Sequence, residues 1–128
     1  MALVTGTDFL VIGSTDVDRS VKFYGETLGL ERGKQWGNMP GYEFETGNLT
    51  IAVIQSDAFG LEFKPSTNPL EFRVEDFEAA KAELESRGVE FSGETIDSGV
   101  CYQAFFRDQD GNALILHHRY APPDARPS

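Results

Sequence analysis

The stretch "FFRDQDGNALILHH", residues 105–118, predicts two β-strands joined by a tight turn. The residues on either side of the turn are mostly apolar, and "DQDG" contains the residue types that favour a reversal of the chain. The second strand ends in two neighbouring histidines, just beyond Ile115. The hairpin therefore raises the question of whether this protein holds a catalytic metal.

Outward from this hairpin, the chain repeats one order of elements twice. The pattern predicts strands at 8–14, near 31–37, at 41–46, 49–55, 70–74, near 89–93, at 100–107 and 112–118, and helices at 16–30 and 76–88. Asp16 and Asp76 are good N-caps, and Gly29 and Gly88 are suited to end the helices. The sequence thus predicts an internal duplication of a βαβββ module.

One helix covers only one face of each small sheet, so the other face must pack on something or line a cavity. Two modules with their free faces curled inward predict an α+β fold, a cup-shaped mixed sheet with the helices outside. A ferredoxin-like sandwich has a similar mix of elements but leaves the extra strand of each half unexplained. We expect one domain over 1–120, with modules 8–55 and 69–118, a connector at 56–68 and a flexible tail at 121–128.

The charge is strongly acidic, with a net value of −10 from 21 acidic and 11 basic side chains. This charge disfavours nucleic acid and membrane surfaces as partners; it would attract a cationic small molecule, or serve only solubility. Cys101 is the one cysteine, so no internal disulfide is possible, and we expect it to pack beneath a helix. With no secretion signal or membrane-spanning run expected, we predict a cytoplasmic protein.

Two segments, "DVDRSVKFYGETLGL" (16–30) and "FRDQDGNALIL" (106–116), carry a family resemblance. Together with the duplicated order of elements, they resemble the vicinal oxygen chelate superfamily of glyoxalases, extradiol dioxygenases and bleomycin-resistance proteins. The resemblance covers about residues 8–118. It implies paired βαβββ modules that usually assemble as homodimers.

The resemblance also implies where a metal would be bound, because metal-bearing members take their ligands from inward-facing strand positions. In this sequence those positions are Phe9, Ala52, Pro69 and Ile115. None of these side chains has a lone pair to offer a divalent ion, so we expect no metal and no cofactor. A displaced pair of ligands from Glu71 and His117 stays open, although two ligands make a weak site.

Strand parity gives the expected binding face. If "DQDG" is a four-residue loop, Arg107 lies opposite Asn112, and Tyr102 lies opposite His117 on the cup face. Trp36 is either a half-buried packing residue or a stacking platform, and His117 is either a structural histidine or a base. The expected ligand-binding residues are Phe9, Trp36, Pro69, Glu71, Tyr102, Phe106, Ile115 and His117.

We therefore expect a metal-independent binding or sequestration protein of the glyoxalase/bleomycin-resistance type, associated with antibiotic resistance. Its cup would bind a flat aromatic or cationic molecule, with Glu71 favouring positive charge. The alternative is a glyoxalase- or dioxygenase-like lyase or isomerase, for which Glu71 and His117 are weak catalytic candidates, and a ligand-free module is a third possibility. We expect a homodimer, because two modules alone leave sheet edges uncovered.

Overall fold

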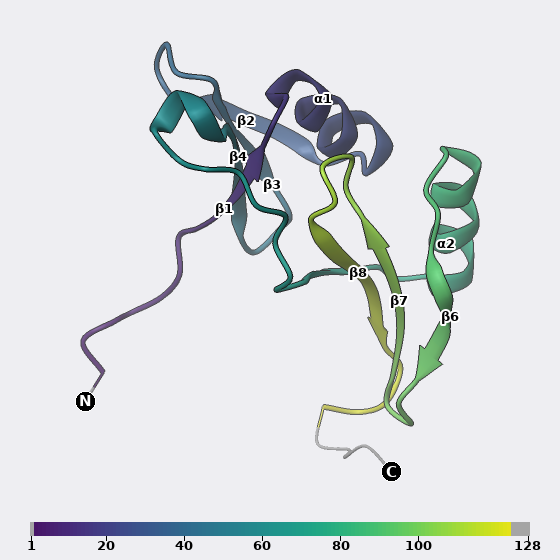
Figure 1. The fold of residues 1–128 in the computed structure, drawn as a ribbon. Coiled ribbons are helices and arrows are strands. Elements are labelled where there is room, and N and C mark those ends of the chain that lie inside the picture. The colour runs from purple at the N-terminus through teal and green to yellow at the C-terminus, as the bar shows by residue number, and fades with distance from the viewer. Residues whose placement is uncertain (1, 124–128) are drawn as a thin grey trace. The chain divides into compact units, whose positions relative to one another are not determined.

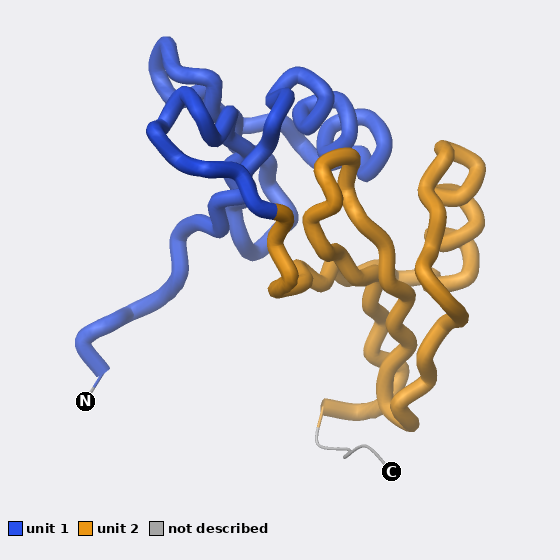
Figure 2. Tube along the Cα trace, viewed as in Figure 1, with its two compact units in different colours: residues 1–64 blue, residues 65–128 orange. Residues whose placement is uncertain are grey.

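The computed structural model describes residues 2–123 and divides the chain into two compact units, residues 1–64 and residues 65–128 (Figure 2). Each unit contains one four-stranded mixed sheet. The α+β class and the two βαβββ modules are thus confirmed, and neither sheet closes into a barrel. The single domain over 1–120 and the cup stay predictions, and 124–128 of the expected tail lie outside the described residues.

Unit 1 has the strand order β1-β4-β3-β2 (Figure 1). Its elements are β1 (Phe9–Ser14), α1 (Val17–Lys22), β2 (Glu31–Gln35), β3 (Gly41–Glu45) and β4 (Thr50–Gln55). A π-helical turn (Phe23–Thr27) extends α1, and a 3-10 turn (Ser56–Phe59) follows β4. Strands β1 and β4 are parallel, which requires a crossover such as the one that contains α1.

Unit 2 repeats this topology with the order β5-β8-β7-β6. Its elements are β5 (Leu70–Arg73), α2 (Phe77–Ser86), β6 (Ser92–Asp97), β7 (Cys101–Arg107) and β8 (Ala113–Arg119). The prediction of a strand near 89–93 was wrong in position: β6 begins at Ser92 and ends at Asp97. Val89, which the prediction included, is a buried residue just after α2. Strand β6 is a polar edge strand with mostly exposed residues, so it carries little apolar alternation from which to locate it.

Both helices begin and end where the sequence predicts. The carboxylates of Asp16 and Asp76 each accept a backbone N–H from the first turn, at 3.4 and 3.1 Å. Gly29 and Gly88 follow the helical segments with φ values of 72° and 94°, a left-handed conformation that a residue with a Cβ rarely adopts. The N-caps and the terminating glycines are confirmed.

Each helix packs on one face of its own sheet. In unit 1 the Tyr24 and Phe44 rings lie 6.3 Å apart, and both side chains are fully buried. In unit 2 the Phe77 ring at the start of α2 lies 5.6 Å from the Tyr102 ring of β7. We call the opposite face of each sheet the helix-free face, because its side chains do not pack against the helix of the same unit.

The two units correspond position by position, because their parallel strands share one register. Val11 pairs with Ala52 in unit 1, and Glu71 pairs with Ile115 in unit 2. The neighbouring antiparallel pairs extend the match. Equivalent positions are Gly13 and Arg73, Gly41 and Gln103, Ile54 and His117, Ala52 and Ile115, and Phe44 and Phe106.

Candidate functional site

Trp36 lies on the helix-free face of unit 1, where the chain turns between β2 and β3. The turn is tight, since the Met39 N–H donates to the Trp36 carbonyl at 2.9 Å. The indole packs over Gly41, where an added Cβ would lie 3.2 Å from Trp36 Cε3. Its N–H donates to Glu43 Oε2 at 2.8 Å. Trp36 is therefore a half-buried ring held in a fixed orientation against the sheet.

Two further rings contact Trp36 edge to face. The centroids of Phe9 and Phe59 lie 6.3 and 6.2 Å from the indole centroid, at nearly right angles. Phe9 is 48% exposed, and Val11, the next residue of β1 on the same face, is 49% exposed. A large apolar side chain left this exposed on a strand is available to bury against a ligand or another surface.

An open depression of about 540 Å³ lies at the same end of β1. It is lined by Thr7, Asp8, Glu31, Glu45, Gly47, Asn48, Leu49 and Thr50. Thr50 is the β4 partner of Phe9, so the depression and the aromatic cluster adjoin. The Glu45 carboxylate accepts the Thr50 hydroxyl at 2.9 Å. Three carboxylates in one depression give this end of unit 1 a negative potential that favours cations.

The helix-free face of unit 2 has a different chemistry. Arg73 pairs with His117, and Gln103 pairs with the same histidine from the other side. Arg73, His117 and Gln103 thus form one row of cross-strand partners, and Glu71, Ile115 and Phe105 form the next row. The Gln103 amide donates to Glu71 Oε1 at 2.8 Å and so links the two rows. Ile115 lies in that next row and is buried. Glu71, Ile115 and His117 therefore share one face as expected, whereas Pro69 is exposed and precedes β5.

The expected register of the β7–β8 hairpin was wrong by one residue. Arg107 pairs with Ala113 rather than with Asn112, and Tyr102 pairs with His118. A shift of one residue moves one strand's side chains to the other face. Tyr102 and Phe106 consequently lie on the helix side of the sheet, where Phe106 contacts Phe91 at 5.3 Å between centroids. The structure does not bring these two rings together with Glu71 and His117.

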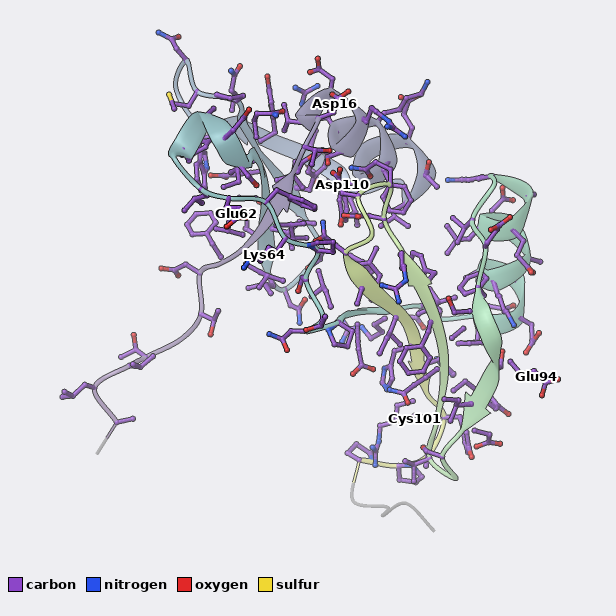
Figure 3. All side chains as sticks on the ribbon, viewed as in Figure 1. Asp16, Glu62, Lys64, Glu94, Cys101 and Asp110 are labelled. Atoms are coloured by element: carbon purple, nitrogen blue, oxygen red, sulfur yellow. The ribbon has the colours of Figure 1, made fainter. Side chains whose placement is uncertain are left out.

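The same shift corrects the placement of Cys101. This cysteine shares the helix-free face with Gln103, so it does not pack beneath α2. Its side chain is half-buried, at the end of β7 opposite the turn that carries Asp110 (Figure 3).

A side-chain clasp in the β7–β8 turn accounts for the register. Asp108 and Asn112 are only 5% and 3% exposed. Asp108 accepts the backbone N–H and the side-chain N–H of Asn112, at 2.9 and 2.8 Å. Asn112 Oδ1 in turn accepts the Ser66 N–H at 2.8 Å. The Asp108 N–H also donates to the Asn112 carbonyl at 3.0 Å, so residues 108–112 form a five-residue turn, and β8 begins at Ala113.

The closing hairpin and the first helix belong to a pattern that extends over most of the chain. A sequence model of the Glyoxalase/Bleomycin resistance protein/Dioxygenase superfamily matches residues 6–116. The chain belongs to this superfamily. The comparison with curated proteins gave no match.

Solved structures support the same fold for this superfamily member. A glyoxalase/bleomycin resistance protein/dioxygenase from Nocardioides is 17% identical, with 98% of this chain and 92% of that chain covered and a TM-score of 0.77. A superfamily member from Sphaerobacter thermophilus is 22% identical, with coverage of 92% and 100% and a TM-score of 0.77. Lactoylglutathione lyase from Agrobacterium tumefaciens is 14% identical, with coverage of 90% and 94% and a TM-score of 0.75. These likenesses concern the fold alone.

A metal ion does not fit the positions that the superfamily resemblance implies. Phe9, Ala52 and Ile115 lie on helix-free faces, and Pro69 precedes β5, but none of the four side chains offers an oxygen or nitrogen ligand. Within residues 2–123, His, Cys, Asp and Glu side chains form no group of three or more that could hold a metal.

The same stretch contains no helix with the length and apolar character needed to cross a membrane.

Proposed function

We propose that this protein binds and sequesters a flat aromatic cation on the helix-free face of unit 1, without a metal ion. The observation that carries the proposal is the fixed Trp36 indole beside the exposed ring of Phe9. Aromatic rings held in place offer a large contact area at little conformational cost. The Glu43 carboxylate and the acidic depression next to the rings favour a positive charge on the ligand.

Metal independence is proposed from the side chains at the four implied ligand positions. None of the four, Phe9, Ala52, Pro69 and Ile115, offers a ligand atom; Phe9 and Pro69 expose apolar surface, whereas Ala52 and Ile115 are buried. A member with this composition gains affinity by burying ligand area, as a sequestration protein does. The homodimer and the cytoplasmic location stay predictions.

Tryptophan fluorescence tests the proposal, since Trp36 is the only tryptophan of the chain. We expect saturable quenching by N-methylacridinium, and affinity about fivefold lower for neutral acridine at pH 8, which corresponds to about 1 kcal/mol. Glu43→Gln should abolish that difference. Glu94→Gln removes the same charge from exposed Glu94 in unit 2 and should preserve it. Absence of saturable quenching by either probe would refute the proposal.

One observation favours a second candidate, metal-free acid–base catalysis. The Glu71 carboxylate and the His117 imidazole lie on one face of unit 2, in neighbouring rows of β5 and β8. A carboxylate and an imidazole can transfer a proton between them and a substrate. Recovery of each bound probe chemically unchanged supports sequestration, whereas turnover that is lost in His117→Ala would support catalysis.

A further inference from the structure

We propose that the helix-free face of unit 2 binds the carboxylate of a small organic acid through Arg73, with His117 and Gln103 beside it. The three residues are consecutive cross-strand partners on β5, β8 and β7. Paired residues on neighbouring strands point to the same face, about 5 Å apart. The three side chains therefore form one polar row across the sheet.

The Arg73 guanidinium is available for a ligand. Arg73 is exposed, and within the described part of the chain it makes no hydrogen bond or ion pair. The nearest acid on its own strand and face is Glu71, and one oxygen of that carboxylate already accepts the Gln103 amide at 2.8 Å. Arg87, by contrast, forms an ion pair with Glu83 on α2, with 3.1 Å between Nε and Oε2. Arg73 is thus an unneutralised cation on a protein of net charge −10.

The fold itself does not require this polar row. In unit 1 the equivalent positions hold Gly13, Ile54 and Gly41, and the same four-stranded sheet forms around them. A second guanidinium, that of Arg119, lies on the same face of β8 two residues beyond His117 and donates to the Pro122 carbonyl at 2.8 Å. A basic row that one module lacks, and that the sheet does not need, is best explained by something that it binds.

The chemistry of the row indicates a carboxylate. A guanidinium presents a planar fork of N–H donors that matches the two oxygens of a carboxylate. An imidazole N–H from His117 supplies a further donor beside that fork. In the next row, Ile115 is buried, and its half-buried partner Phe105 provides apolar surface for the rest of the ligand. The expected class is therefore an aromatic or aliphatic carboxylate.

The test compares naphthalene-2-carboxylate with naphthalene-2-carboxamide, which has the same rings without the charge. Titrations of the full chain are followed by NMR signals of the His117 ring and the Gln103 side-chain amide. We expect both signals to shift, and the carboxylate to bind about tenfold more tightly than the carboxamide, as for a charge-assisted contact.

Variants separate a specific contact from general attraction. Arg73→Gln should reduce the tenfold preference to about onefold, and Arg73→Lys, which keeps the charge without the fork, should retain part of it. Arg87→Gln removes an equal charge from α2 and should leave the preference unchanged. Equal affinity of the two probes, an unaltered preference in Arg73→Gln, or shifts confined to 1–64 would overturn the inference. Because Trp36 quenching reports on unit 1, failure here is distinguishable from failure of the proposed function.

Discussion

The helix-free face of unit 1 is aromatic and acidic, whereas the same face of unit 2 is basic and polar. At matched positions unit 1 has Gly13, Gly41 and Ile54, and unit 2 has Arg73, Gln103 and His117. The helix sides, by contrast, keep the same character, with buried Phe44 in one unit and buried Phe106 in the other. The helix side of the module therefore specifies the fold, which leaves the rows of Gly13 and Arg73 on the helix-free faces free to differ in chemistry.

The strongest test of this equivalence truncates the matched phenylalanines. Phe44 and Phe106 are 0% and 2% exposed on the helix sides of their sheets, where Phe44 packs near Tyr24 and Phe106 against Phe91. We expect Phe44→Ala and Phe106→Ala each to lower the free energy of unfolding by about 3–5 kcal/mol. Chemical denaturation measures the loss, and amide hydrogen exchange shows which unit opens. A difference of more than about 2 kcal/mol between the variants would contradict the equivalence of the helix sides.

Substitution of an asparagine in the turn before β8 should destabilise the protein more than the same substitution in the turn before β4. Asn112 is buried and connects Asp108 with Ser66, whereas Asn48 in the matching turn of unit 1 is exposed and accepts only the Thr46 hydroxyl. We expect Asn112→Ala to cost about 2–3 kcal/mol, because it leaves buried polar groups unpaired. Asn48→Ala should cost less than about 0.5 kcal/mol. Thermal or urea unfolding with equal losses in both variants would show that the clasp does not stabilise unit 2.

Much of the fold was predictable because its signals are local. Asp16 and Asp76 satisfy N–H groups within one turn of their own helices, and Gly29 and Gly88 act at single residues. The order of elements follows from these signals, and the superfamily that residues 16–30 and 106–116 resemble is confirmed by the match over residues 6–116. Strand β6 was misplaced because it lies at an edge, where no burial imposes alternation.

The candidate site was harder to predict because it depends on register, which is set by contacts distant in sequence. The Asn112 side chain accepts the Ser66 N–H from the connector, and Asn112 belongs to the turn rather than to β8, so Tyr102 and Phe106 lie on the helix side. The residues "DQDGN" contain the signal, since Asp and Asn side chains often bond to nearby backbone groups. Trp36 was ambiguous because its packing depends on Gly41, which is separated from it by a turn.

The two units also differ in one hydrogen bond that follows the last strand of unit 2 and, among the described residues, has no counterpart after the last strand of unit 1. In unit 2 the Tyr120 hydroxyl donates to Asp97 Oδ1 at 2.7 Å, joining the residue after β8 to the end of β6. This hydrogen bond raises the pKa of Tyr120 to about 12. The same bond, assisted by the Gly99 N–H, lowers the pKa of Asp97. In unit 1 the residues after β4 form the 3-10 turn instead.

This contact gives the smallest expected effect, a dependence of stability on pH. The folded-state pKa of Tyr120 is raised from 10.0 to about 12. Tyr120 therefore contributes its full share to the free energy of unfolding below pH 10, and this share is lost as the pH rises toward 12. Because the pKa of Asp97 is lowered from 3.8, its contribution is present above that value and is lost as the pH falls through its folded-state pKa. The stability difference between the wild type and Tyr120→Phe should therefore be constant between these limits and shrink on both sides.

Tyr42→Phe in unit 1 is the control, since the Tyr42 hydroxyl makes no hydrogen bond among the described residues. Urea unfolding at pH 7, 9 and 11.5 measures both differences, and a wild-type-to-Tyr120→Phe difference that does not fall between pH 9 and 11.5 would show that the contact does not stabilise unit 2.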